Sequence, residues 1–300
     1  ARRDEAAERF HCPVYENYHE MLEKEELDLV CVITRNDQHC AMTCDSLEAG
    51  VNVLVTKPWA ANAAEAEKMI ASADASGKTL LPWLPARWGC DVRRLRELLA
   101  EKAVGNVFTI RRAVRSYSRR TDWQTDSACA GGYILNWGPH IVDPPLLLTG
   151  YTAECVNAWT YQAINPGDVE DSFFAMFTNA DGTLVTAEHT ISAEEPLNWV
   201  VQGDAGIICV RGKALTLHRK KPAQPDDPTQ HADMVAGEAE VIEETLDGGI
   251  YGDQHEIYAD IAAHLRGERA YPVSCNDALR LSKVLDAIRT AAVDRTTVSL

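Results

Sequence analysis

A lysine that directly follows an apolar run is the first residue whose type and position suggest chemistry. Residues 51–55 (VNVLV) predict a buried strand, and Lys57-Pro58 comes just after it. A strand in this position delivers the lysine to the edge of a sheet. An ammonium partly withdrawn from water has a lowered pKa and can polarise a substrate hydroxyl by donating a hydrogen bond. Position alone leaves a second interpretation equally open, a lysine in a surface loop.

A histidine in a glycine-flanked segment is the second candidate. If a helix covers residues 134–148, then Asn136, His140 and Asp143 share one face, because they fall at i, i+4 and i+7. Histidine titrates near neutral pH, so His140 is the natural candidate for a general base. Taken alone, the pattern slightly favours a core histidine satisfied by a carboxylate partner over a catalytic one.

The composition limits the classes of partner. A chain of 300 residues with 46% hydrophobic and 25% charged residues predicts a globular protein of two domains. Its formal net charge of -16 repels phosphates, which argues against nucleic acid and anionic membranes but not against a small neutral substrate. No apolar run reaches the ~20 residues of a membrane span. We interpret the basic clusters at residues 111–120 and 219–221 as a solvated face or loop.

Nine cysteines at scattered positions do not form a spaced disulfide framework. Their number is odd, which favours a reducing compartment and predicts a cytoplasmic protein. Cys40 and Cys44 lie four residues apart beside His39, but no CxxC or HExxH motif accompanies them. We therefore expect buried thiols and no metal site.

The first 86 residues predict parallel strands joined by helices. Near-continuous apolar, β-branched runs predict strands buried on both faces, and helical patterns separate them. Such alternation predicts right-handed βαβ units, in which ligands sit beyond the carboxyl ends of the strands. Asn36 or Asp37 is a candidate N-cap of the first of these helices. The predicted strands are residues 27–33, 51–55 and 79–84, the helices are 36–49 and 63–75, and the ligand-facing segments are 34–39, 56–59 and 85–87.

The remaining residues predict a different layout. After a helix at residues 92–102, strands separated by tight turns indicate a largely antiparallel sheet, with the helix at 134–148 lying against it. The predicted strands are residues 105–114, 156–163, 173–178, 184–191 and 198–203; residues 221–237 predict a loop, and 254–266 and 276–292 predict helices. The fold class is α/β: an incomplete Rossmann-type parallel-sheet domain followed by an α+β domain with a large, mainly antiparallel open sheet.

Several motifs, taken in order, resemble the Gfo/Idh/MocA family of glucose-fructose oxidoreductases and inositol dehydrogenases. Residues 34–39 (TRNDQH) match its Thr-Pro-Asn-x-x-His-like stretch, and 49–58 (AGVNVLVTKP) match Ala-Gly-x-x-Val-x-x-Glu-Lys-Pro. Residues 131–143 match its Gly-Gly-x-x-x-Asp-x-Gly-x-His-x-x-Asp helix. The resemblance continues at residues 169–171, 198–206 and 273–279, so it covers essentially the whole chain.

The resemblance implies hydride transfer between a sugar, inositol or related polyol hydroxyl and NAD or NADP. Lys57, His140 and Asn136 would be catalytic, with Lys57 and His140 beside the carbinol carbon and the proton passing to His140 or to a relay of both. A homodimer or homotetramer is implied as well. Residues implied to line the cofactor are Thr34, Asn36, His39, Thr56, Lys57 and Pro58; weaker candidates for substrate contact or support are Arg87, Trp123, Tyr133 and Asp143. Two alternatives stay open: an NAD-dependent glycosidase acting by transient oxidation, and a non-catalytic homologue.

The chain departs from the family pattern at two site positions. Asn136 stands where many members have Asp, and an amide cannot take a proton, which moves the base role to His140. Thr56 stands where many members have Glu, so a charge partner for Lys57 is absent. A related subgroup carries Asn in the helix motif together with Arg-x-Asp-Trp-Gln upstream, and residues 120–124 (RTDWQ) resemble that stretch.

The largest departure concerns the phosphate-binding turn. A dinucleotide-binding unit opens with a strand, a GxGxxG turn and a helix, yet Gly50 is the first glycine here. We therefore expect an N-terminally truncated member whose dinucleotide-binding domain, residues 1–86, lacks the first strand, turn, helix and second strand. Arg2 and Arg3 would lie near the adenosine ribose, a weak pointer to NADP. Residues 87–300 would form the substrate-binding and oligomerisation domain, with the helix at 276–292 packing back on the first domain.

Overall fold

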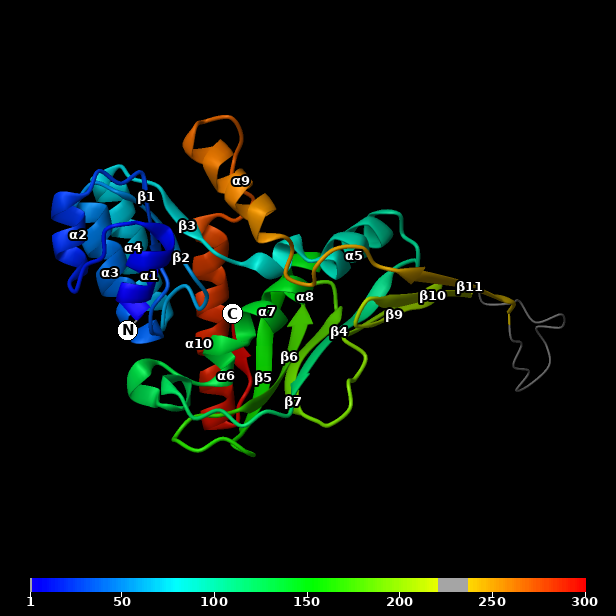
Figure 1. Cartoon of the computed structure of the whole chain (residues 1–300). Helices are drawn as coiled ribbons and strands as arrows, with labels where there is room; N and C mark the ends of the chain where they lie inside the picture. The colour runs from blue at the N-terminus through cyan, green and yellow to red at the C-terminus, as the bar shows by residue number, and fades with distance from the viewer. Residues whose placement is uncertain (1, 221–236) are drawn as a thin grey trace, which may run out of the picture.

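The computed structural model of the chain describes residues 2–220 and 237–300, so the predicted loop at 221–237 lies outside the described residues except for Gly237. Two sheets organise the molecule (Figure 1). The smaller sheet has the parallel order β1-β2-β3, with β1 at Leu29–Val32, β2 at Asn52–Val55 and β3 at Leu80–Pro82. The three predicted parallel strands are thus confirmed, each a little shorter than its apolar run.

Helices flank this small sheet at short spacing. The helix α4 (Ala63–Ser76) begins where Asn62 accepts a hydrogen bond from the Glu65 amide at 2.9 Å, and it ends at Gly77, whose φ of 66° suits glycine. The prediction that Asn36 or Asp37 caps the helix α3 (His39–Glu48) was wrong. Asn36 lies in a 3₁₀ turn, and its side-chain amide donates to the Ala130 carbonyl at 2.7 Å. This bond links the part of the molecule that holds the small sheet (the first lobe) to the part that holds the large sheet (the second lobe). The other helices of this part are α1 (Arg2–Phe10), α2 (Tyr18–Lys24) and α3 (His39–Glu48).

The larger sheet has nine strands in the order β11-β10-β9-β8-β4-β7-β6-β5-β12. Its neighbours pair antiparallel except β4 with β7, which confirms the mainly antiparallel open sheet. The sequence analysis missed the last four strands of the chain. The bounds are β4 Val107–Ser116, β5 Ala153–Tyr161, β6 Ser172–Asn179, β7 Leu184–Ile191, β8 Trp199–Gly203, β9 Gly206–Arg211, β10 Ala214–Lys220, β11 Ala239–Thr245 and β12 Val298–Ser299.

The helix predicted at 134–148 is in fact three short helices, α6 (Tyr133–Asn136), α7 (Gly138–Ile141) and α8 (Asp143–Leu148). Proline lacks the amide that a continuing helix needs, and Pro139, Pro144 and Pro145 each lie in the first turn of a new segment. The breaks rotate the segments relative to one another. Asn136 and His140 still face a common cavity, whereas Asp143 points into a buried ion pair.

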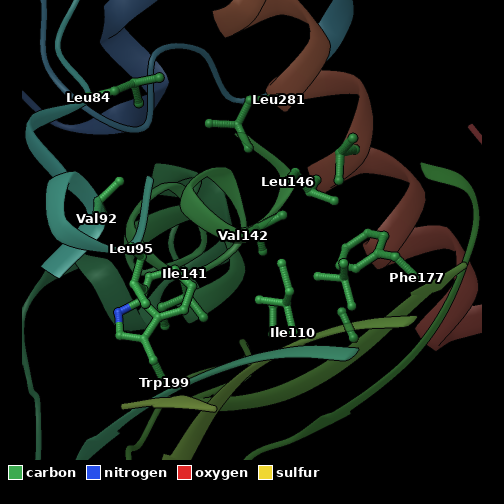
Figure 2. Close-up of a cluster of buried hydrophobic side chains, with 14 of the residues drawn as sticks. Leu84, Val92, Leu95, Ile110, Ile141, Val142, Leu146, Phe177, Trp199 and Leu281 are labelled. Carbon is green, nitrogen blue, oxygen red and sulfur yellow. The ribbon is translucent and has the colours of Figure 1, made fainter. Parts of the chain in front are cut away.

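The main core lies between the large sheet and these short helices (Figure 2). Ile110 and Trp199 project from the sheet toward Ile141 and Val142, and all four are at most 1% exposed. Each such side chain contributes about 1.5–3 kcal/mol by burial, so the sheet and the short helices hold one another in place. The site residues at 133–143 therefore sit on a rigid support.

The long helix α10 (Cys275–Asp294) packs against both parts of the molecule (Figure 1). A capping box between Ser274 and Asp277 starts it. Further along, Asp286 accepts from the Ala63 amide at 2.8 Å, and Arg289 donates to the Ala61 carbonyl at 2.8 Å. These bonds fasten the start of α4 to α10. The helices α5 (Cys90–Ala100) and α9 (Gln254–Leu265) complete the fold, close to their predicted bounds.

Candidate active site

A cavity of about 440 Å³ opens where the carboxyl ends of β1, β2 and β3 meet the second lobe. This is where parallel sheets bind their ligands. The described residues that line it are Ile33, Thr34, Asn36, Thr56, Lys57, Trp83, Pro85, Trp123, Gln124, Asn136, His140, Tyr251, Gly252 and Gln254. None of these is an Asp or Glu, so the chemistry of this cavity depends on amine, imidazole, amide and hydroxyl groups.

Lys57 enters the cavity directly after β2, across a cis peptide bond to Pro58. Its Nζ donates to the main-chain oxygen of Asn136 at 2.8 Å and to the side-chain Oδ1 of the same residue at 2.7 Å. Burial, together with a smaller contribution from the charge of Arg120, lowers the pKa of Lys57 from 10.5 to about 8. No carboxylate counters this, because position 56 is Thr and position 136 is Asn. The interpretation of Lys57 as a surface-loop lysine is thus excluded.

His140 lies at the other side of the same cavity and is buried. Burial, followed by the charges of Lys57 and Arg112, lowers its pKa well below the ordinary value, so its ring is neutral at pH 7. Its Nδ1 has no hydrogen-bond partner among the described residues. A buried nitrogen without a partner costs free energy unless a ligand satisfies it. The alternative interpretation, a core histidine satisfied by a carboxylate partner, is therefore wrong: no carboxylate of the described residues bonds His140, and Asp143 bonds Arg87 instead.

The residues predicted to line the cofactor separate into two groups. Thr34, Asn36 and Thr56 line the cavity together with Lys57. His39 and Pro58 do not line it. His39 is fully buried, and its two ring nitrogens contact the Pro58 carbonyl at 2.8 Å and the Thr34 carbonyl at 3.2 Å. It therefore braces the loops that follow β1 and β2 against each other.

The four weaker substrate candidates also separate. Trp123 lines the cavity, whereas Tyr133 is buried beside a neighbouring hollow and accepts a hydrogen bond from Asn165 at 3.1 Å. Arg87 forms a two-pronged ion pair with Asp143, at 2.9 Å from Nε and 2.7 Å from Nη2, outside the cavity lining. Its Nη1 also reaches Asp277 of α10 at 3.1 Å. Arg87 and Asp143 thus join structural elements and do not face this cavity.

Sequence reasoning missed the cavity wall formed by residues 251–254. The ring of Tyr251 lies 4.6 Å from the ring of His140, centroid to centroid, and Gln254 opens α9 beside it. No motif marks these residues. Trp83 and Pro85 were missed as individual contacts, although they follow β3 at an edge where ligand contacts were expected.

The cavity suits a nicotinamide and a small hydroxylated substrate. Trp83 and Ile33 provide apolar surface for a flat ring. Gln124 Oε1 and His140 Nδ1 are buried, belong to cavity-lining residues and have no partner among the described residues. In residues 2–220 and 237–300, no cluster of His, Cys, Asp and Glu could hold a metal ion. In the same residues, no helix has the length and apolar character that crossing a membrane requires.

Comparison with known families identifies the class. Residues 1–82 match the model of the oxidoreductase family with an NAD-binding Rossmann fold, and residues 92–209 match the GFO/IDH/MocA C-terminal domain. Together with a lysine and a histidine that line one cavity at the carboxyl ends of the parallel strands, these matches define an NAD(P)-dependent oxidoreductase. The chain belongs to the Gfo/Idh/MocA family, as its motifs predicted.

Individual relatives resemble the chain over most of its length. It is 26% identical over 286 residues to the uncharacterized oxidoreductase YdgJ of Escherichia coli, covering 91% of this chain and 81% of that protein. It is 24% identical over 288 residues to the scyllo-inositol 2-dehydrogenase (NADP(+)) IolW of Bacillus subtilis, covering 91% and 79%. The crystal structure of an NAD-binding protein from Listeria innocua superposes with a TM-score of 0.85 at 23% identity, covering 99% of this chain and 88% of that one.

Proposed function

We propose that the protein oxidises a secondary hydroxyl of a sugar, an inositol or a related polyol and passes the hydride to NAD or NADP. The observation that carries this proposal is that Lys57 and His140, both with lowered pKa values, line one cavity at the ends of the parallel strands. The relative IolW, named as a scyllo-inositol dehydrogenase, supports the substrate class.

The reaction converts a carbinol to a carbonyl group. The carbinol C–H bond supplies a hydride to the oxidised nicotinamide, the O–H bond supplies a proton, and the products are a ketone, NAD(P)H and one proton. The cofactor, when bound, supplies the hydride-accepting carbon. The side chains of the protein have two tasks, to hold the hydroxyl in line and to receive its proton.

Lys57 is suited to receive the proton. A neutral amine has two N–H groups and one lone pair, and Asn136 offers two acceptor oxygens to Lys57 Nζ. With both N–H groups bound, the lone pair is left to accept the proton that the substrate releases. Because the pKa of Lys57 is about 8, the neutral form is populated near physiological pH and still binds a proton when one arrives.

His140 is better suited to position the hydroxyl and to pass the proton on than to keep it. Burial and the charges of Lys57 and Arg112 all disfavour an imidazolium at this position. A neutral ring can accept at one nitrogen and donate at the other. In the proposed relay the proton crosses His140 and comes to rest on Lys57.

A turnover assay tests this function. Purified protein would be mixed with NAD⁺ or NADP⁺ and with myo-inositol, scyllo-inositol or D-glucose, and absorbance of the reduced nicotinamide would be followed. We expect reduced cofactor to accumulate with at least one polyol and not with the Lys57→Met variant. Sugar release from a glycoside without net reduction would instead identify a glycosidase that acts by transient oxidation. Absence of dinucleotide binding by calorimetry would rule out both enzymes.

Assembly and location follow as further parts of the proposal. We expect a homodimer or homotetramer, because the large sheet exposes aromatic side chains such as Trp159 (47%) and Tyr161 (63%) on β5. Light scattering of the purified protein measures this, and a monomer at micromolar concentration would contradict it. All nine cysteines are free, which supports a reducing compartment such as the cytoplasm.

A further inference from the structure

A second cavity, of about 450 Å³, borders the first and shares Tyr251 with it. Its lining includes Arg112, Arg115 and Ser116 of β4 together with Trp137. Tyr251 lies against His140, so this second cavity begins one aromatic ring away from the proposed reaction centre. A substituent of the substrate would reach this second cavity by passing Tyr251.

Three polar atoms that belong to residues of this lining are buried and have no partner among the described residues. They are Arg112 Nε, Arg115 Nε and Ser116 Oγ. Guanidinium groups only donate hydrogen bonds, so both arginines call for an acceptor. Such unpaired donors are rare in folded proteins, and one established reason for them is a ligand that satisfies them.

The two arginines of this lining differ in their ion pairing. Arg112 is 2% exposed, packs over the Trp199 ring at 4.6 Å and bonds Asp91 at 3.2 Å. Asp91 balances the charge of Arg112 and also accepts from the Trp199 indole at 2.7 Å. Arg115 has no ion pair in the described part of the chain, and the other carboxylate of the lining, Glu195, is exposed.

A third hollow adjoins the second cavity. It shares Ser116, Ser118 and Trp137 with that cavity and adds Arg119, Arg120 and Asp122, of which Arg120 and Asp122 form an ion pair at 2.9 Å. Residues 105–120 contain five arginines and no acid. The interpretation of this cluster as a solvated basic face is wrong for Arg112, because its strand position points it inward against Asp91 and Trp199.

We propose that the substrate carries an anionic substituent, a carboxylate or a phosphate, which binds Arg115, Arg112 and Ser116 while its carbinol lies between Lys57 and His140. This inference rests on the proposed function and narrows its substrate class to acidic or phosphorylated sugars and polyols. Oxyanions match guanidinium donors in charge and geometry. The local arginines also offset the repulsion that a net charge of -16 exerts on an anion.

Matched sugars test this proposal. D-glucose, D-glucuronate and D-glucose 6-phosphate share a ring and differ in charge at one end. Their Kd values would be measured by calorimetry in the presence of NADH, which makes binding independent of turnover. We expect at least one charged sugar to bind the native protein more tightly than glucose, and the tighter of the two identifies the anionic group.

The variant Arg115→Gln should raise the Kd of that charged sugar, relative to glucose, about ten- to hundredfold, the loss expected for a charge-assisted hydrogen bond. Arg115→Lys should raise this relative Kd by a smaller factor. Arg111→Gln is the matched control, because Arg111 lies on the same strand but pairs with Glu188 at the surface. The proposal would be overturned if Arg115→Gln left the ratio of the two Kd values, charged sugar to glucose, unchanged, or if glucose bound the native protein as tightly as both charged sugars. If the charged sugar binds through Arg115 but no polyol or acidic sugar is ever oxidised, the anion site stands and the proposed function fails.

Discussion

Lys57 donates hydrogen bonds from one Nζ to both oxygens of Asn136, the main-chain carbonyl at 2.8 Å and the side-chain Oδ1 at 2.7 Å. An aspartate at position 136 would place a carboxylate beside the amine and favour the ammonium. The amide of Asn136 holds the amine without favouring its charge. Burial, with Arg120, can therefore lower the pKa of Lys57 to about 8.

Removal of the amine should abolish catalysis without unfolding the protein. Lys57→Met keeps the length of the side chain and removes a buried charge, so we expect kcat to fall about 10²–10⁴-fold while thermal stability stays the same or rises. The matched control is Lys283→Met, whose exposed ammonium pairs with Glu67. A Lys57→Met enzyme with native kcat would show that the amine has no part in proton transfer.

The oxidation rate should rise with pH through the pKa of Lys57. Burial and Arg120 lower this pKa from 10.5 to about 8, so the amine is neutral, and able to take a proton, above that value. The reverse reduction needs the protonated form and should fall through the same midpoint. A pH profile of kcat/KM in both directions measures this. Profiles that change in the same direction would contradict the assignment.

Asn136→Asp should move that midpoint upward. A carboxylate beside Lys57 stabilises the ammonium, which typically raises such a pKa by about one to three units. We expect slower oxidation at neutral pH and recovery at alkaline pH. Asn276→Asp, which adds the same charge at an exposed position of α10, should leave the profile as it is. A midpoint that does not move in Asn136→Asp would mean that another group controls the profile.

The ion pair between Arg87 and Asp143 should matter for stability. Asp143 is fully buried, and Arg87 also reaches Asp277, so Arg87→Met should cost about 3–5 kcal/mol in free energy of unfolding, the typical cost of leaving a buried charge unpaired. Arg93→Met, from the exposed pair with Glu256, should cost less than about 1 kcal/mol. Urea unfolding measures both. Equal losses would show that the buried pair has no special role.

Mild acid should destabilise the fold through buried histidines. Burial lowers the pKa of His189 to about 4 and that of His140 well below 6.5. Between the lowered pKa and 6.5, each of these histidines therefore takes up a proton only in the unfolded chain. Stability is then greatest above about pH 6.5 and falls as the pH drops, by up to about 1.4 kcal/mol per pH unit for each histidine. His189→Gln should flatten this slope and the exposed-residue variant His11→Gln should not. An equal slope in all three proteins would contradict the prediction.

Local sequence signals were sufficient for the part of the site that follows the parallel strands. An apolar, β-branched run such as 51–55 is buried whichever neighbours it has, so the position of Lys57 at the sheet edge could be predicted. The segment at 133–148 shows the limit of such patterns. Its apolar spacing predicted one helix, but Pro139, Pro144 and Pro145 remove the amides that would continue it.

Contacts between distant residues could not be read from the chain. Tyr251 reaches His140 across more than a hundred residues, and nothing in its local sequence announces this. The same holds for Arg112: a run of arginines looks solvated until Asp91 and Trp199 are known to lie beneath it. Only tertiary packing determines which member of such a cluster turns inward.

The late position of α10 in the chain has a consequence for biosynthesis. Asp286 and Arg289 of this helix bind main-chain atoms of residues 61–63, near the lysine-bearing strand end. A growing chain that emerges N-terminal end first therefore exposes its small parallel sheet long before the helix that braces it has been made. These bonds form only after residue 289 has been made, and a premature stop codon before residue 275 removes all of α10 and with it this support of the start of α4.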